Sequence, residues 1–225
     1  MKKKSLIHAC LCLNRESMMF YSPELIDLSI LNLNSDIIQD LEIISQSALE
    51  RVIKNWLSQA QIEAKTLAIY FAEENYFFKD LTDTKINPQD PEIKNFLENI
   101  PFNHVVTKVF PMSQGARIAA INVSLLKPLV TVLEKCGFTI LAATPAYVFG
   151  INSSNPFSKE LAKKSLENQE IFKVYNFIDQ EEVEKKLAAQ KTFLSVEINK
   201  NLIIMIAFLL ILIVVLVVLL ISQKK

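Results

Sequence analysis

Short apolar runs separated by polar turns fill the first part of the chain. Leu6–Leu13 is an apolar stretch interrupted only by His8, and Met18–Tyr21 follows it across four polar residues. Between Leu25 and Leu33, apolar and polar residues alternate. A period of two is typical of strands, and short polar connections usually join antiparallel neighbours. The pattern therefore predicts three antiparallel strands at the start of the fold.

The period then changes to that of a helix. From Asp36 to Ala60, apolar residues recur every three or four positions, and Trp56 lies on this stripe, so we expect its side chain to be buried. Ser47 and the glutamate three residues later have the spacing of a capping box. A strand is predicted for Thr66–Ala72, and Tyr76–Leu81 is expected to pair back on it through the polar residues between them.

A second half of similar order follows a polar connection over 82–101, which contains prolines and a short predicted helix at 92–98. This half is predicted to contain a hairpin (104–110 and 117–123), a helix capped by Ser124 and ended by Gly137, and a strand at 138–143. The order strand, strand, helix, strand thus occurs twice. The predicted class is α+β, with two β-β-α-β-like halves forming one domain over 1–150.

The C-terminal part is predicted to tether this domain. Residues 151–201 have the composition of a linker and a helical stalk, and 222–225 form a short tail. Between them, 202–221 is an uninterrupted apolar run, long enough to cross the roughly 30 Å hydrocarbon core as one helix. The expected anchor residues along it include Leu202, Phe208, Leu212, Val218 and Ile221.

Basic residues determine the expected orientation of this anchor. Lysines are more numerous on its N-terminal side, and the flank with the excess of lysine and arginine usually faces the cytoplasm. The chain is therefore expected to be a single-pass protein of the inner membrane with a cytoplasmic N-terminal domain. A thin apolar stripe at Val183, Leu187 and Leu194 is too short to predict a coiled coil, so a solvated stalk is expected, with a homodimer seam as the alternative.

Charge and cysteine content narrow the function. Lys and Arg total 24 and Asp and Glu total 24, so no field of one sign favours nucleic acid as a partner. The three cysteines do not form an even disulfide framework, which fits a reducing compartment.

Two kinds of site can be sought among the polar residues. His8, Cys10 and Cys12 alternate along one strand and are weak candidates for metal ligands, with His104 or Cys136 as a fourth ligand. The alternative is a central strand buried on both faces. The only glycines are Gly115, Gly137 and Gly150, and they form no phosphate-binding loop. The sequence therefore predicts no catalytic residues, no cofactor and no enzymatic activity.

Three consecutive aromatic residues suggest an interaction surface. Tyr76, Phe77 and Phe78 fall in a predicted strand, and side chains on a strand alternate between its faces. At least one of the three must then point outward, towards a partner or a second layer. The alternative is a strand that is covered on both faces.

Two segments resemble the actin-like cytoplasmic scaffolds of pilus assembly and type II secretion, the PilM and GspL families. SALERVIKNWLSQAQIEAKTLAIYF is similar to the helix of these proteins that leads into a strand, and SLLKPLVTVLEKCGFTILAATPAYVF to their helix that ends at glycine before a strand. The GspL branch also carries a single membrane-spanning helix. The Asp-x-Gly and glycine-rich phosphate loops of PilM-type members have no counterpart here, so the resemblance implies a reduced form that lacks the nucleotide-binding lobe.

The resemblance implies a membrane-anchored scaffold that recruits other inner-membrane proteins to a pilus-assembly or secretion platform. Two alternatives remain. The chain could be a tail-anchored adaptor unrelated to pili, or a degenerate nucleotide-binding enzyme.

Overall fold

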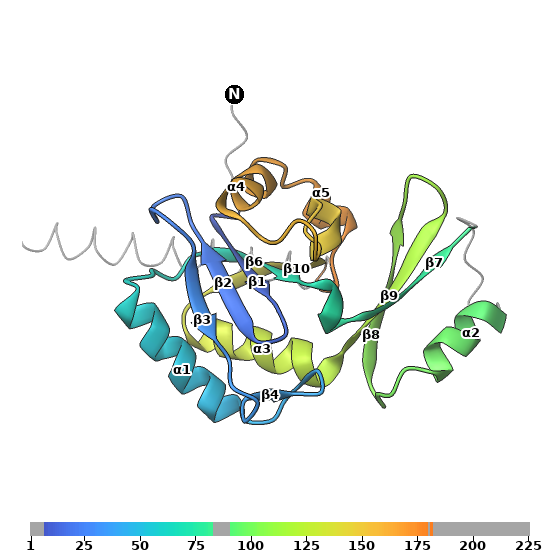
Figure 1. Ribbon diagram of the computed structural model, residues 1–225, viewed down its shortest axis with the longest axis horizontal. Helices are drawn as coiled ribbons and strands as arrows, with labels where there is room; N and C mark the ends of the chain where they lie inside the picture. Colours follow the sequence, from blue (N-terminus) through green and yellow to red (C-terminus); the bar gives the residue numbers. More distant parts are fainter. Residues whose placement is uncertain (1–6, 83–90, 180, 182–225) are drawn as a thin grey trace, which may run out of the picture. The chain divides into compact units, whose positions relative to one another are not determined.

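The computed structural model describes residues 7–82, 91–179 and 181, and its elements are shown in Figure 1. Two sheets organise it, one with the strand order β10-β6-β1-β2-β3 and one with the order β7-β9-β8. The larger sheet consists of β1 (Ala9–Leu13), β2 (Ser17–Tyr21), β3 (Ser29–Asn32), β6 (Thr66–Phe71) and β10 (Thr139–Pro145). The smaller sheet consists of β7 (Phe77–Leu81), β8 (Val105–Pro111) and β9 (Ala116–Asn122), and a short hairpin pairs β4 (Ile38–Gln39) with β5 (Glu42–Ile43).

Helices cover both faces of the larger sheet (Figure 1). The helices of the described residues are α1 (Gln46–Gln59), α2 (Pro91–Glu98), α3 (Val123–Lys135), α4 (Lys159–Glu167) and α5 (Ile171–Val174), with short 3-10 turns η1 (Glu73–Asn75) and η2 (Ala146–Phe149). The helices α1 and α3 cover one face of the larger sheet, and α4 and α5 cover the other. Because the central strands β1 and β6 are enclosed from both sides, every residue of each is buried.

The opening strands follow the sequence pattern. β1 pairs antiparallel with β2, and β2 with β3, as predicted. β6 then runs parallel to β1 and also to β10, and these parallel pairs require the long crossovers that contain α1 and α3. The predicted hairpin of the second half is confirmed as β8 and β9.

The segment before α1 corrects the predicted helix over 36–60. The helix begins only at Gln46, and its cap is Ser45, whose hydroxyl accepts the Ala48 N–H at 3.3 Å, rather than Ser47. Asp40 and Leu41 have φ angles of 49° and 61° in the turn of the β4–β5 hairpin, a conformation that a helix cannot contain. Trp56 is buried, as predicted, at 7% exposure.

The cap of α3 is also corrected. The side-chain oxygen of Asn122 accepts the Ser124 N–H at 2.9 Å, so Asn122 is the N-cap and Ser124 lies inside the helix. The predicted glycine end is confirmed: the helix ends at Lys135, and Gly137 follows with a φ of +95°.

The predicted pairing of Tyr76–Leu81 with the preceding strand is wrong. β7 pairs with β9 instead, and η1 carries the chain away from the larger sheet. β6 could not accept it, because both edges of β6 are already bonded, to β1 and to β10. β10 completes the larger sheet, so the two halves share one sheet and are not separate β-β-α-β units.

The compact unit extends to residue 180, beyond the expected domain boundary at 150. Within the segment expected to be linker and stalk, α4 packs on the larger sheet: the Tyr70 hydroxyl and the Ser165 hydroxyl are 2.5 Å apart. Residues 175–178 then bond to β10, with the Phe177 N–H donating to the Ala143 carbonyl at 2.7 Å.

The second unit begins at residue 181, and the anchor segment 202–221 lies outside the described residues. Within the described ranges, no helix has both the length and the apolar character needed to cross a membrane.

Candidate functional site: a groove between the two sheets

A hollow of about 930 Å³ lies where the larger sheet meets the smaller one. We call it the inter-sheet groove. Its walls come from the β1–β2 turn, the segment around β4, the η1 turn, the start of β7 and the residues after α2. The lining residues are Arg15, Glu16, Leu33, Ser35, Ile38, Gln39, Asp40, Leu41, Glu74, Asn75, Phe77, Pro101 and Phe102.

The topology explains why the groove forms at this place. β1 and β6 are parallel and end side by side, at Leu13 and Phe71, and ligands of open α/β sheets bind outside the carboxyl ends of parallel strands. Hydrogen bonds join the chain segments that follow these strands. The buried Asn75 amide donates to the Leu13 carbonyl at 2.8 Å, and the Arg15 N–H donates to the Glu74 carboxylate at 3.1 Å.

Apolar side chains provide another part of the wall. The rings of Phe77 and Phe102 contact each other edge-on, with centroids 5.8 Å apart. Leu41 lines the groove from the β4–β5 turn, whose left-handed backbone is unusual for a residue with a branched side chain. The Asn122 side-chain amide fixes this turn by donating to the Leu41 carbonyl and to the Glu42 carboxylate, both at 3.1 Å.

The groove is acidic at its rim. Its lining contains three carboxylates, Glu16, Asp40 and Glu74, and one cation, Arg15, so its formal charge is negative. These four residues are exposed. An acidic rim beside an apolar wall favours a segment that carries both basic and apolar side chains. The lining contains no histidine and no cysteine, so it offers no nucleophile paired with an imidazole base.

The aromatic run 76–78 contributes to the groove through one residue. Tyr76 is buried and packs against Phe78 and Phe177, and Phe78 lies under the Arg117 guanidinium, 4.1 Å from the ring centroid. Phe77, on the alternate face of β7, lines the groove and is only partly buried. An interface role for these residues stays a prediction, and the geometry directs it to Phe77.

His8, Cys10 and Cys12 are not brought together as a ligand set. His8 is exposed with its Nδ1 2.6 Å from the Thr66 hydroxyl, whereas both cysteines are fully buried. Burial raises the pKa of the Cys12 thiol to about 12, and it raises the pKa of Cys10 further. The alternative of a central strand buried on both faces is confirmed, and the described residues contain no cluster of three side chains suited to a metal.

The three glycines serve separate turns. Each has a positive φ, and they lie in the β8–β9 hairpin, after α3 and after η2. At Gly115 an added Cβ would come within 1.9 Å of the Leu81 carbonyl oxygen, so the tight hairpin requires this glycine.

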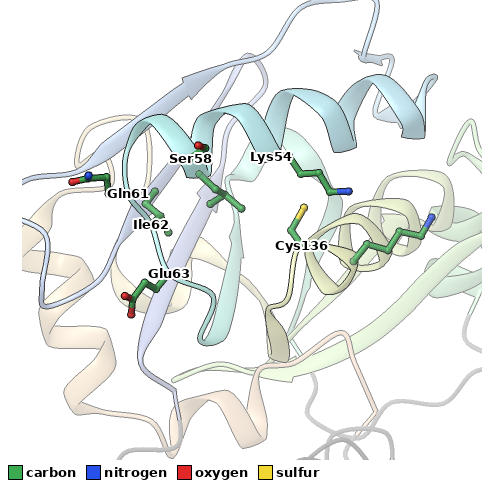
Figure 2. A pocket seen from close by; sticks show the side chains of 8 residues that line it. Lys54, Ser58, Gln61, Ile62, Glu63 and Cys136 are labelled. Atoms are coloured by element: carbon green, nitrogen blue, oxygen red, sulfur yellow. The ribbon is translucent and has the colours of Figure 1, made fainter.

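A second hollow, of about 520 Å³, lies between the C-terminal ends of α1 and α3 (Figure 2). Lys54 and Cys136 line it, and the chain from Gln61 to Glu63 forms its other wall. Glu50 holds ion pairs with Lys54 at 2.6 Å and with Lys135 at 3.7 Å, which reduces the attraction of this site for anions. Burial raises the pKa of the Cys136 thiol, so this cysteine is not poised as a thiolate.

No family model matches the sequence, and no curated protein is similar to it. Solved structures are similar to it in fold. One is described as the PilM-PilN type IV pilus biogenesis complex, with a TM-score of 0.49 and 14% identity over 65% of this chain and 49% of that chain. A second is the cytoplasmic domain of EpsL, an inner-membrane component of the type II secretion system of Vibrio cholerae, with a TM-score of 0.39 and 14% identity over 63% of this chain and 56% of that one.

A third is a Bacteroides thetaiotaomicron protein with an actin-like ATPase fold, at a TM-score of 0.36 and 13% identity, covering 61% of this chain and 52% of that chain. The chain thus spans about half the length of each structure. These are proteins of the kinds that the sequence resembles: pilus assembly, type II secretion and the actin-like fold. Identities of 13–14% do not transfer residue roles, which have to come from the groove itself.

Sequence reasoning did not predict the groove. Its wall draws on segments that lie up to 87 positions apart, from Arg15 to Phe102, and their meeting depends on β7 leaving the larger sheet. One signal was present: charged residues come two and three positions after the buried runs that end at Leu13 and Phe71, as Arg15 and Glu16 and as Glu73 and Glu74.

Proposed function

We propose that this chain is a membrane-anchored scaffold that binds a segment of another inner-membrane protein in the inter-sheet groove and so recruits it to a pilus-assembly or secretion platform. The observation that carries the proposal is the groove itself, with an apolar wall of Phe77, Phe102 and Leu41 beside an acidic rim. A few buried aromatic anchors surrounded by polar groups are typical of interfaces that bind by complementarity. The resemblance of the sequence to PilM and GspL supports the choice of partner class.

Binding without catalysis is part of this proposal. Polar groups of the groove are carboxylates, amides, one serine and one arginine, and the glycines of the chain are placed elsewhere. A cradle for phosphates needs backbone N–H groups that approach the ligand closely, usually through glycine. The second candidate, a degenerate nucleotide-binding enzyme, is therefore less well supported.

Site-specific photo-crosslinking in cells tests the binding role. A photoreactive phenylalanine analogue replaces Phe102 in the full-length chain, and the same analogue at the exposed residue Val174 serves as the control. We expect Phe102, and not Val174, to crosslink to a membrane protein of the assembly platform, and Phe77→Ala to weaken the crosslink. A pattern identical at the two positions would contradict the proposal.

Calorimetry with ATP and GTP tests the absence of catalysis. We expect no saturable heat with the full-length chain. Tight nucleotide binding with turnover would replace the scaffold by the enzyme alternative.

A further inference from the structure

The sheet edges of the described residues are protected in different ways. At one edge of the larger sheet, residues 175–178 cover β10: the Asn176 side chain accepts the Ala143 N–H at 2.8 Å and donates to the Leu141 carbonyl at 3.3 Å. In the smaller sheet, the edge strands β7 and β8 contain charged residues, and β8 ends in Pro111. Lysine, proline and covering segments are the usual means by which proteins prevent edge-to-edge association.

Among the residues that the structure describes, no segment covers β3, and the strand has no lysine and no proline, so its length of four residues is the protection that it has. It is bonded to β2 on one side only, and the stretch from Leu28 to Leu33 contains no charge and no proline. Ile30, at the centre of the strand, is 57% exposed, and Ile26 just before it is 92% exposed. An uncharged edge strand with an exposed apolar residue is a template for another extended backbone.

The ladder with β2 identifies the groups that are free to pair. The Leu33 N–H donates to the Glu16 carbonyl at 2.8 Å, in register with Asn32 opposite Ser17. Because bonded and non-bonded pairs alternate in an antiparallel ladder, Leu33, Leu31 and Ser29 direct their main-chain groups to β2. The main-chain groups of Ile30 and Asn32 therefore point outward.

We propose that β3 pairs antiparallel with β3 of a second copy of this chain, about a two-fold axis at Leu31. In this register Ile30 of one copy lies opposite Asn32 of the other, and each such pair can exchange both N–H···O bonds. A register centred on Ile30 would instead require the Leu28 N–H, which already donates to the Asp27 carboxylate at 2.8 Å. The axis at Leu31 thus uses the free groups and places no charge opposite a like charge.

A second copy of β3 fits this edge because the edge requires an extended, uncharged strand with outward-pointing main-chain groups, and β3 is such a strand. It is extended and uncharged, and a two-fold contact between identical strands closes on itself, so the edges are consumed in a dimer. The contact is short, so it belongs to the small, weak class of interfaces. The experiment must therefore trap the dimer in place.

Pairwise cysteine crosslinking reports the register directly. Two differently tagged full-length copies are co-expressed, one with Ile30→Cys and one with Asn32→Cys. Both carry Cys136→Ser, which removes the partly exposed native cysteine, whereas Cys10 and Cys12 are buried and can stay. Opposed residues of a bonded pair lie about 5.5 Å apart between Cα atoms, within the range of a disulfide. Oxidation should give a mixed dimer that is lost when either variant is expressed with wild-type chain, and a Val174→Cys pair should give none.

Charge exchange separates loss of pairing from loss of folding. A copy with Ile30→Lys and Asn32→Lys places lysine opposite lysine in the dimer, and a copy with glutamate at both positions does the same with carboxylates. After chemical crosslinking in cells, each copy should give no dimer with itself, whereas the lysine copy and the glutamate copy together should give the dimer that the wild type gives. Absence of the mixed disulfide, a β3 crosslink to a different protein, or self-association of the lysine copy at the wild-type level would each overturn the proposal.

Discussion

Replacing Trp56 by alanine tests the packing of the larger sheet most directly. The indole is 7% exposed and packs edge-on against Phe20, with ring centroids 6.2 Å apart. Its Nε1–H donates to the Ser29 hydroxyl at 2.9 Å, and this bond ties α1 to the edge strand β3. The Trp56 side chain thus stabilises the fold through buried apolar area, a ring contact and a hydrogen bond.

The magnitude follows from these contributions. An indole buries roughly 200 Å², which at about 25 cal/mol per Å² gives an upper value of about 5 kcal/mol. The hydrogen bond adds about 1 kcal/mol net. Alanine keeps its own share of the buried area and the neighbours relax in part, so we expect Trp56→Ala to lower the free energy of unfolding by about 3–5 kcal/mol.

Urea unfolding of the full chain, followed by circular dichroism, measures this loss, with the exposed α1 residue Arg51→Ala as a control expected to change it by less than about 0.5 kcal/mol. Ser29→Ala should cost about 1–3 kcal/mol, since it leaves the indole N–H unpaired. In the Trp56→Phe background the same serine change should cost much less. A Trp56→Ala loss under about 1 kcal/mol, or emission of a solvated indole from the folded protein, would refute this account of the core.

Three further changes test other parts of the fold. Gly115→Ala should destabilise the β8–β9 hairpin by about 1–3 kcal/mol, because its Cβ would collide with the Leu81 carbonyl at a positive φ; faster amide exchange confined to the smaller sheet would show it. The Arg117 guanidinium lowers the pKa of Asp80, so this ion pair stabilises the fold fully above the ordinary carboxyl pKa, about 3.9, and less as pH falls through the lowered value. The difference in unfolding free energy between wild type and Asp80→Asn should therefore shrink in acid. A difference that grows in acid would contradict the pairing. Asn176→Ala should cost about 1–3 kcal/mol and expose the β10 edge to amide exchange, and unchanged protection of that edge would show that the side chain does not hold it.

Local pattern predicted the elements better than their partners. The hairpin of β8 and β9, the meander of β1 to β3 and the end of α3 at Gly137 depend on neighbouring residues, and all three are confirmed. The pairing of β7 with β9 and the addition of β10 to β6 join residues far apart in the chain, so no local period reports them.

The prediction of helix for 36–44 was wrong for a different reason. Its apolar residues have helical spacing, but Asp40 and Leu41 adopt a left-handed turn that the tertiary contact with Asn122 stabilises. The groove depends on this turn and on the pairing of β7 with the smaller sheet. Both are determined by tertiary contacts, so the local sequence pattern could not predict the groove.

The segment 175–178 gives the chain a particular mechanical character. The Phe177 N–H donates a hydrogen bond to the Ala143 carbonyl of the larger sheet, while the Phe177 ring packs on Phe110 of the smaller sheet. Tyr175 stacks on the same Phe110 and donates to the Pro111 carbonyl at 2.7 Å. A mechanical force applied to the chain after residue 179 therefore acts on both sheets at the same time. The contacts of 175–178 with β10 and with β8 have to break together before either strand can separate from its sheet.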